Sequence, residues 1–252
     1  MRLKNKTVIV TGGASGFGEG MIRRFAEEGA KTVIADINDA AGQKLAAEIT
    51  GKGAGSLYVH CDVTSAENLN NLASVASRQF GSIDVMINNA GMPQTNQPML
   101  NVDEATFDRI FEVNVKSIFL AAKAVVPVMR EQGAGSIINT ASTAGLRPRP
   151  GLVWYNASKG AVNTLTKAMA VELAPDQIRV NALCPVAGET PMLGAFMGGE
   201  VTNEMRDKFV STVPMGRLST PLDMANAALF FASDESTFIT GVCMEVDGGR
   251  CI

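Results

Sequence analysis

The N-terminal segment, residues 6–36, constrains the fold of this chain more than any other part of the sequence. It opens with a β-branched apolar run at 6–11, passes through a glycine-rich turn, and continues as a helical pattern at 19–28. A second apolar run follows at 31–36. Strand, glycine turn, helix and strand in this order predict a βαβ unit, in which a helix joins two parallel strands.

The turn and the end of the second strand are suited to hold a dinucleotide. Glycines let the backbone pass close to a phosphate, and the N-terminus of the next helix offers unpaired N–H groups and a positive dipole end. Asp36 lies at roughly the 20-residue offset at which a carboxylate meets the adenosine ribose hydroxyls, and it would repel the extra phosphate of NADP. The alternative is a structural βαβ unit without a ligand. We predict NAD as the cofactor, with contacts at Gly12, Ser15, Gly16, Phe17, Gly18, Asp36 and Ile37.

The alternation of strands and helices continues along the chain. Strand patterns cover 56–61, 83–88, 136–142 and 179–183, and helical patterns cover 39–50, 65–80, 103–131 and 154–173. Strands that alternate with helices indicate a parallel sheet covered on both faces. We therefore predict an α/β fold, a doubly wound parallel sheet of about seven strands with helices on both faces, in one domain.

Composition argues against several classes of partner and cofactor. The net charge of −3, without a Lys/Arg run, argues against nucleic acid or an anionic membrane as a partner. The longest apolar stretch, 118–129, contains Lys123 and Pro127 and is far shorter than the ~20 residues of a membrane span. The cysteines have no metal-binding spacing, so we expect no metal site. The N-terminal apolar run is too short for a signal peptide, and we expect a soluble cytoplasmic protein.

Small and polar residues follow the third and fourth predicted strands, at the edge where a parallel α/β sheet binds ligands. Asp62 could hydrogen-bond an adenine amine, and the small Ala90–Gly91 pair lets the backbone approach a ribose. Turn formation is the alternative for both groups. We assign Asp62, Val63, Asn89, Ala90 and Gly91 to the cofactor site.

The stretch 142–159 carries the residues suited to acid–base chemistry. Tyr155 and Lys159 lie one helical turn apart on the same face of a predicted helix. A neighbouring ammonium favours the phenolate and lowers the pKa of a tyrosine from its ordinary value of about 10. Ser142 ends a predicted strand, where its hydroxyl could hydrogen-bond a substrate oxygen that Tyr155 protonates or deprotonates. The alternative is a surface tyrosine beside a solvated lysine.

Asn114 interrupts the apolar pattern of the predicted helix at 103–131. An amide inside such a helix must be hydrogen-bonded. Its partner is either the backbone, which would make it structural, or a water that leads to the active site. The sequence leaves both possibilities open.

Together these residues resemble the motifs of the short-chain dehydrogenase/reductase family over the whole chain. The matching motifs are Thr11-Gly-x-x-x-Gly16-x-Gly18, Asp62-Val63, Asn88-Asn-Ala-Gly91, Asn114, Ser142, Tyr155-x-x-x-Lys159 and Val246-Asp-Gly-Gly249. The resemblance implies a single Rossmann-type NAD(P)-binding domain, residues 1–252, a homotetramer built through two long helices, and hydride transfer between a nicotinamide and a carbonyl or alcohol carbon.

The resemblance also implies the role of each catalytic residue. Tyr155 would donate or accept the proton, while Lys159 would lower its pKa and hold the nicotinamide ribose. Ser142 would position the substrate oxygen. Asn114 would support a proton relay.

One segment departs from the family pattern. Similar proteins have Pro-Gly and then a branched residue after the sixth strand, whereas here Val186 replaces that glycine and Gly188 the branched residue. We predict cofactor contacts at Pro185, Gly188 and Thr190, although the departure leaves the local backbone and the Gly188 contact open. The segment at about 189–213 is rich in Met and Gly and is predicted to form a lid over the substrate.

Arg147 and Arg149 lie in a proline-stiffened loop between Ser142 and Tyr155. Guanidinium groups bind carboxylate, phosphate or sulfonate through paired hydrogen bonds, so we hypothesise an anionic or acyl-carrier group on the substrate. The alternative places both arginines toward solvent or at a subunit interface.

These assignments predict an NAD-dependent alcohol dehydrogenase or carbonyl reductase that acts on a small secondary alcohol or ketone. An NADPH-dependent oxoacyl-carrier-protein reductase would share the catalytic residues, but Asp36 argues against it. A dinucleotide-binding subunit without catalysis is a remote alternative, because Ser142, Tyr155 and Lys159 are all present.

Overall fold

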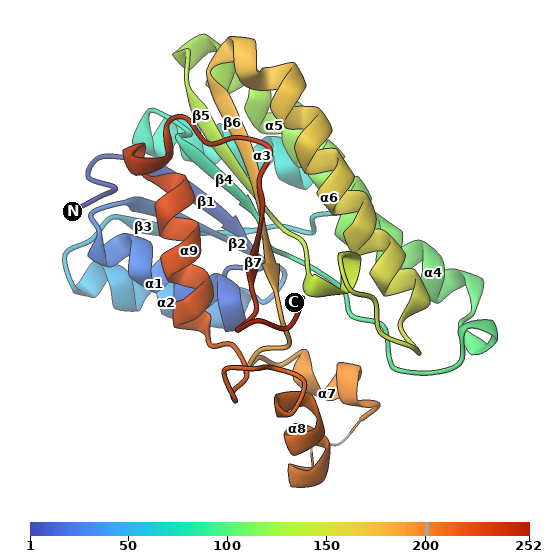
Figure 1. Cartoon of the computed structure of the whole chain (residues 1–252). Coiled ribbons are helices and arrows are strands. Elements are labelled where there is room, and N and C mark those ends of the chain that lie inside the picture. The colour runs from blue at the N-terminus through green and yellow to red at the C-terminus, as the bar shows by residue number, and fades with distance from the viewer. Residues whose placement is uncertain (200–201) are drawn as a thin grey trace.

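The computed structural model describes residues 1–199 and 202–252, which form a layered α/β structure around one parallel sheet (Figure 1). The seven strands are β1 (Thr7–Thr11), β2 (Lys31–Asp36), β3 (Ser56–His60), β4 (Val85–Asn88), β5 (Gly135–Thr140), β6 (Ile178–Pro185) and β7 (Cys243–Val246). Their order is β3-β2-β1-β4-β5-β6-β7, and every neighbouring pair is parallel. This topology confirms the predicted doubly wound fold.

Helices cover both faces of the sheet, as its apolar strands require. They are α1 (Gly16–Glu27), α2 (Asp39–Gly51), α3 (Ala66–Phe80), α4 (Glu104–Phe111), α5 (Ser117–Gln132), α6 (Val153–Leu173), α7 (Leu193–Met197), α8 (Asn203–Val210) and α9 (Pro221–Ala232). Val8 and Val10 of β1 face α1, α2 and α9 in one buried cluster, whereas Ile9 faces α3, α5 and α6 in another. The alternation of strand side chains thus divides the core into two layers.

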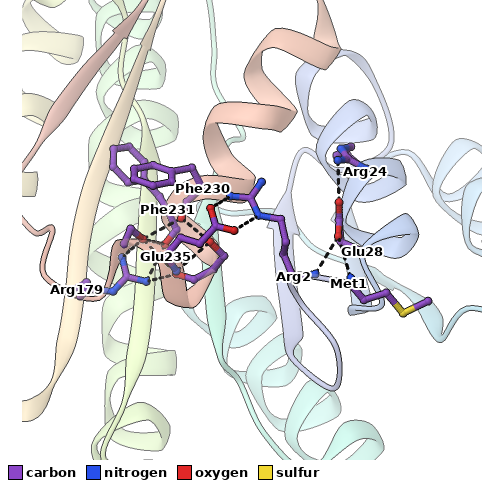
Figure 2. A network of polar contacts seen from close by, with 10 residues as sticks. Met1, Arg2, Arg24, Glu28, Arg179, Phe230, Phe231 and Glu235 are labelled. Carbon is purple, nitrogen blue, oxygen red and sulfur yellow. Dashed lines mark hydrogen bonds and ion pairs between the residues drawn. The ribbon is translucent and has the colours of Figure 1, made fainter.

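A polar network ties the N-terminal residues to the connection after α9 (Figure 2). The Arg2 guanidinium donates two hydrogen bonds to Glu235, and the Arg2 N–H donates to Glu28 Oε2 at 2.9 Å. Arg179, at the start of β6, donates to the Phe231 carbonyl at 2.8 Å. These contacts lie near the amino ends of β1 and β6, so they brace the scaffold away from the carboxyl ends of the strands.

Helices α7 to α9 and strand β7 lie where no element was predicted, and two predicted elements differ from the structure. The predicted helix at 103–131 is divided into α4 and α5 by a π-helical stretch, Glu112–Lys116, which contains Asn114. Ser142 does not end a strand, because β5 stops at Thr140 and Ser142 caps the 3-10 turn Thr143–Gly145. Both departures occur where a polar side chain bonds a neighbouring backbone instead of continuing a regular element.

The region predicted as a lid contains α7 and α8, which project beyond the sheet in Figure 1. Leu193 and Met197 of α7 pack with Leu218, and Met205 and Phe209 of α8 join this apolar cluster. Residues 200–201 of the predicted 189–213 segment lie outside the described residues. Within the described ranges, no helix is both long and apolar enough to cross a bilayer.

Candidate active site

A cavity of about 480 Å³ opens at the carboxyl ends of strands β1 to β6. It gathers residues that are distant in the sequence, as expected where a doubly wound sheet reverses its strand order. Gly18, Asn114 and Arg147 are not part of its wall. The other sequence-predicted residues all line it: Gly12, Ser15, Gly16, Phe17, Asp36, Ile37, Asp62, Val63, Asn89, Ala90, Gly91, Ser142, Arg149, Tyr155, Lys159, Pro185, Gly188 and Thr190.

The glycine turn has the geometry of a close backbone cradle. Gly12 has φ +61°, and a Cβ there would lie 3.0 Å from the Ala90 Cα. Ser15 precedes α1 and forms no side-chain cap, so its hydroxyl leaves the first-turn N–H groups of this helix available to a ligand. A Cβ on Gly18 would lie 2.1 Å from the Gly12 carbonyl oxygen. A glycine is therefore needed at position 18 because α1 packs closely against the glycine turn, and not because this residue contacts a ligand.

Asp36 is fixed at the cavity wall by two backbone donors. The Ala14 N–H donates to its Oδ2 and the Asn38 N–H to its Oδ1, each at 3.0 Å. Ile37 follows at the rim, with 64% of its surface exposed. A carboxylate held in this way presents a negative charge to whatever occupies this end of the cavity.

Asp62 and Asn89 both line the cavity and hold turns. The Thr64 N–H donates to Asp62 Oδ1 at 2.9 Å, and this bond is the largest cause that lowers the pKa of Asp62. Asn89 Nδ2 donates to the carbonyls of Thr11 at 2.9 Å and Gly12 at 3.2 Å. The turn chemistry offered as an alternative is therefore present, and it coexists with exposure to the cavity.

Ser142, Tyr155 and Lys159 come together at the other end of the cavity. Tyr155 and Lys159 lie in the first two turns of α6 and are both buried, which contradicts a solvated surface pair. The Lys159 Nζ lies 5.8 Å from the centre of the Tyr155 ring and donates to the Thr140 carbonyl at 2.7 Å.

Burial dominates the ionisation of this group. It raises the pKa of Tyr155 to about 12, and a hydrogen bond with Ser142 acts in the opposite direction. Burial lowers the pKa of Lys159 to about 8. Desolvation of the phenolate is thus the largest influence on the Tyr155 pKa, and Lys159 is not among its causes here. Depression of this pKa by the ammonium stays a prediction.

Gln94 holds the N-terminus of α6, and no sequence pattern indicated this role. Its Oε1 accepts the N–H groups of Trp154 at 3.1 Å and Tyr155 at 3.0 Å, and its Nε2 donates to the Gly151 carbonyl at 3.1 Å. The residue before α6, Leu152, offers no side-chain cap. A glutamine distant in the sequence thus satisfies the helix N-terminus, and no local capping motif could have identified it.

Both polar side-chain atoms of Asn114 form hydrogen bonds with other groups of the protein. Its Oδ1 accepts the Met92 N–H at 2.8 Å, and its Nδ2 donates to the Met92 carbonyl and the Ser158 Oγ, both at 3.0 Å. The amide therefore joins the loop after β4 to α6. This is the structural alternative, and the proton relay implied by family resemblance stays a prediction.

The departure at Gly188 has a steric explanation. A Cβ on Gly188 would lie 2.3 Å from the Phe17 Cζ and 2.8 Å from the Ser219 Oγ. The ring of Phe17 therefore occupies the space that a branched residue at position 188 would need. Both Gly188 and Phe17 still line the cavity, together with Val186.

The two arginines of the proline-rich loop have different surroundings. Arg147 Nη1 donates to the main-chain oxygens of Arg250 at 2.7 Å and Ile252 at 3.1 Å, outside the cavity wall. Arg149 lines the cavity, and its Nη2 donates to the Thr212 Oγ1 at 3.1 Å. Of these two loop arginines, Arg149 is therefore the one that lines this cavity.

Comparison with known proteins adds relatives of similar length. The sequence matches the family model described as enoyl-(acyl carrier protein) reductase over residues 12–250. It is 44% identical over 252 residues to the 4-formylbenzenesulfonate dehydrogenase TsaC1/TsaC2 of Comamonas testosteroni, with 100% of both chains covered. It is 38% identical over 248 residues to a cyclopentanol dehydrogenase of the same species, with 98% of each covered.

A solved structure also resembles the whole chain. The crystal structure of a 3-ketoacyl-(acyl-carrier-protein) reductase from Brucella melitensis, complexed with NADH, has a TM-score of 0.92 at 44% sequence identity. The match covers 99% of this chain and 100% of that chain.

Proposed function

Since the chain belongs to the short-chain dehydrogenase/reductase family and is an oxidoreductase, we propose that it transfers a hydride between NAD(H) and a small secondary alcohol or ketone. One observation carries this proposal: Ser142, Tyr155 and Lys159 line the same cavity as the glycine turn and Asp36. A group for acid–base chemistry and a cradle for a dinucleotide thus share one space.

The residues of the cavity fit a nicotinamide dinucleotide. Gly12 and Gly16, at φ +61° and +55°, leave room for a pyrophosphate beside the uncapped N-terminus of α1. The fixed carboxylate of Asp36 favours ribose hydroxyls over a ribose phosphate and so supports NAD over NADP. When bound, the cofactor supplies or accepts the hydride at its nicotinamide ring.

The chain's own residues would manage the proton. Ser142 orients the substrate oxygen, and Tyr155 donates a proton to the carbonyl oxygen during reduction or accepts the hydroxyl proton during oxidation. Lys159, whose Nζ donates to the Thr140 carbonyl at 2.7 Å, would bond a ribose hydroxyl of the nicotinamide side. Its lowered pKa, about 8, makes it able to exchange a proton near neutral pH.

The test is NAD-linked turnover of secondary alcohols, with Tyr155→Phe as the inactive reference and Tyr58→Phe as the matched control at saturating cofactor. We expect Tyr155→Phe to lower kcat by on the order of 10²-fold to 10⁴-fold, as for loss of a general acid or base. Tyr58 lies outside the cavity wall, so its variant should keep kcat. Equal rates for the wild type and Tyr155→Phe would refute the assignment.

Cofactor choice is tested separately through Asp36. We expect a kcat/KM at least ~100-fold higher with NADH than with NADPH, since like charges placed together cost several kcal/mol. Asp36→Ala should narrow this ratio without changing kcat with NADH. Equal kcat/KM values with NADH and NADPH in the wild type would contradict the proposed preference for NAD.

A second candidate is reduction of a ketoacyl group on an acyl carrier protein. The 44% identical neighbour of known structure, a 3-ketoacyl-(acyl-carrier-protein) reductase bound to NADH, favours it. Turnover of a ketoacyl group on carrier protein far faster than of the matching small-molecule ketone would establish this candidate.

A further inference from the structure

Three arginines gather where the loop after β5 meets the C-terminal segment. Arg147 bonds the main-chain oxygen of Arg250 at 2.7 Å. Arg147 and Arg250 are both close enough to Arg149 for their charges to lower its pKa, although burial is the larger cause. The Arg250 Nε is buried without a hydrogen-bond partner among the described residues. Positive charge is therefore concentrated on one side of the cavity.

No Asp or Glu side chain of the described residues lies within 4.0 Å of these three guanidinium groups. Arg147 bonds main-chain oxygens of Arg250 and Ile252, and the Arg149 guanidinium bonds the Thr212 hydroxyl. The chain as a whole has a net charge of −3, so this local gathering of three guanidinium groups contrasts with its overall charge. Like charges kept together without a counterion favour the binding of an anion.

Arg149 is the member of this cluster that faces the cavity, and it is held from several directions. Its guanidinium carbon lies 4.6 Å from the centre of the Phe209 ring, and its Nη2 bonds the Thr212 Oγ1 at 3.1 Å. Its carbonyl accepts from Asn156 Nδ2 at 2.8 Å, which ties it to α6 beside Tyr155. A guanidinium that is already ordered loses less freedom when it binds an anion.

Apolar side chains border the route between Arg149 and the catalytic tyrosine. Leu152 and Tyr155 share a buried cluster with Phe196, whose ring centre lies 5.1 Å from that of Tyr155. Leu152 and Phe196 both line the cavity. A ligand that spans this distance would therefore have an apolar body between two polar ends.

We propose that Arg149 is a specificity-determining residue that binds a carboxylate or sulfonate on a small substrate whose reacting alcohol or carbonyl lies at Ser142 and Tyr155. The inference rests on the proposed function, which it deepens by naming the substrate class. Arg147 and Arg250 strengthen the positive potential behind Arg149 without touching the ligand. Phe209 and Thr212 belong to the predicted lid segment and contact Arg149. The anion therefore binds a guanidinium that is already packed against this segment.

The experiment compares 4-(1-hydroxyethyl)benzoate with its neutral amide, 4-(1-hydroxyethyl)benzamide, and includes the corresponding sulfonate as a second anion. Arg149→Met keeps an aliphatic stem against Phe209 and removes the charge, Arg149→Lys keeps the charge without the planar fork, and Arg147→Met is the matched control. Steady-state KM and kcat are measured for each protein at saturating NAD.

We expect Arg149→Met to raise KM for the anions by about 10-fold to 100-fold, the range for a lost hydrogen bond to a charged group. In Arg149→Met, the KM for the neutral amide should change by less than about twofold. Arg149→Lys should raise the KM for the anions by less than Arg149→Met does. Arg147→Met should keep the preference for anions. A preferred anion will show whether carboxylate or sulfonate is the better ligand, and either preference supports the inference.

Three outcomes would overturn it. Equal losses for the anions and the amide in Arg149→Met would show a structural role. Wild-type turnover of the amide alone would leave the proposed function standing and contradict the anion site. Turnover of neither class, with efficient reduction only of a ketoacyl group on carrier protein, would contradict both the substrate class and the small-molecule function.

Discussion

At the scale of single residues, Tyr155 is subject to two opposing influences on its pKa. Burial raises the pKa to about 12, while the hydrogen bond with Ser142 lowers it by stabilising the phenolate. Under the proposed mechanism, alcohol oxidation requires the phenolate, so the rate should rise with pH until Tyr155 is ionised. Removal of the Ser142 hydroxyl should therefore move this rise to higher pH.

We expect Ser142→Ala to shift the rising limb of the kcat–pH profile upward by about 0.5 to 1 unit, the equivalent of one hydrogen bond. Thr143→Val is the control, because the Thr143 hydroxyl donates to the Pro185 carbonyl at 3.3 Å, as the Ser142 hydroxyl does at 3.5 Å, but only Ser142 is a cause of the Tyr155 pKa shift. A shift of the limb to lower pH in Ser142→Ala would contradict this account.

Gln94 offers a second prediction at this scale, since it holds the N-terminus of α6 without touching the reacting atoms. We expect Gln94→Leu to lower the free energy of unfolding by about 1 to 3 kcal/mol, because the buried N–H groups of Trp154 and Tyr155 lose their acceptor.

The positioning role of Gln94 is separated from a purely structural one by kinetics. Gln94→Leu should lower kcat more than it changes KM for NAD, and Gln94→Glu, which keeps an acceptor oxygen, should recover part of the loss. Chemical denaturation and steady-state kinetics on the same preparations would check both effects. Unchanged kcat in a destabilised Gln94→Leu would show that Tyr155 does not depend on this cap.

These residues also show what a sequence can predict about a site. Gly12, Asp36 and Tyr155 lie at fixed offsets within or directly after local elements, so their positions followed from spacing. Gln94 acts on an element far away in the sequence, and the same is true of the backbone partners that hold Arg147 outside the cavity. Such contacts depend on tertiary structure, which spacing alone does not encode.

At the scale of elements, the start of α1 and the segment that follows β6 pack closely against each other through Phe17 and Gly188. We expect Gly188→Val to raise the Kd for NADH at least tenfold and to destabilise the protein by about 1 to 3 kcal/mol, because the added side chain would overlap the Phe17 ring.

A double-mutant cycle tests this pairing. Phe17→Ala should create space, so Gly188→Val should cost much less in the Phe17→Ala background than in the wild type. Fluorescence titration with NADH and thermal unfolding would measure the two effects. Additive losses in the double variant would show that the two positions are independent.

Element boundaries that depend on the local sequence were predicted, whereas those that depend on long-range contacts were not. Apolar patterns predicted strands β1 to β6 and the helical regions up to α6, because most of these strand residues are buried and these helices pack on the sheet. Helix α9 and the partly exposed strand β7 were not predicted. The π-helical break at Glu112–Lys116 was not predicted, since it accompanies the bonds of Asn114 to Met92 and Ser158. A local pattern contains the interruption but not the partner that stabilises it.

At the scale of the whole molecule, α5 and α6 keep apolar side chains on their outer surfaces. Phe119 of α5 is 57% exposed and Val171 of α6 is 79% exposed, and Ala157 and Ala168 of α6 are also exposed. Small and apolar residues along two long helices are suited to close packing against the same helices of another subunit. We expect a homotetramer, as the family resemblance implies.

Size-exclusion chromatography with light scattering would measure this state directly. The wild type should have about four times the mass of one 26.5 kDa chain. Phe119→Asp combined with Val171→Asp should give smaller species, because a charge buried at an interface without a partner is strongly unfavourable. Lys44→Asp, an exposed change on α2 across the sheet, is the control and should remain tetrameric. A monomeric wild type would instead show that these apolar helix faces are exposed to solvent. Helix α6 would then be ordered by contacts within one chain alone, among them the cap from Gln94.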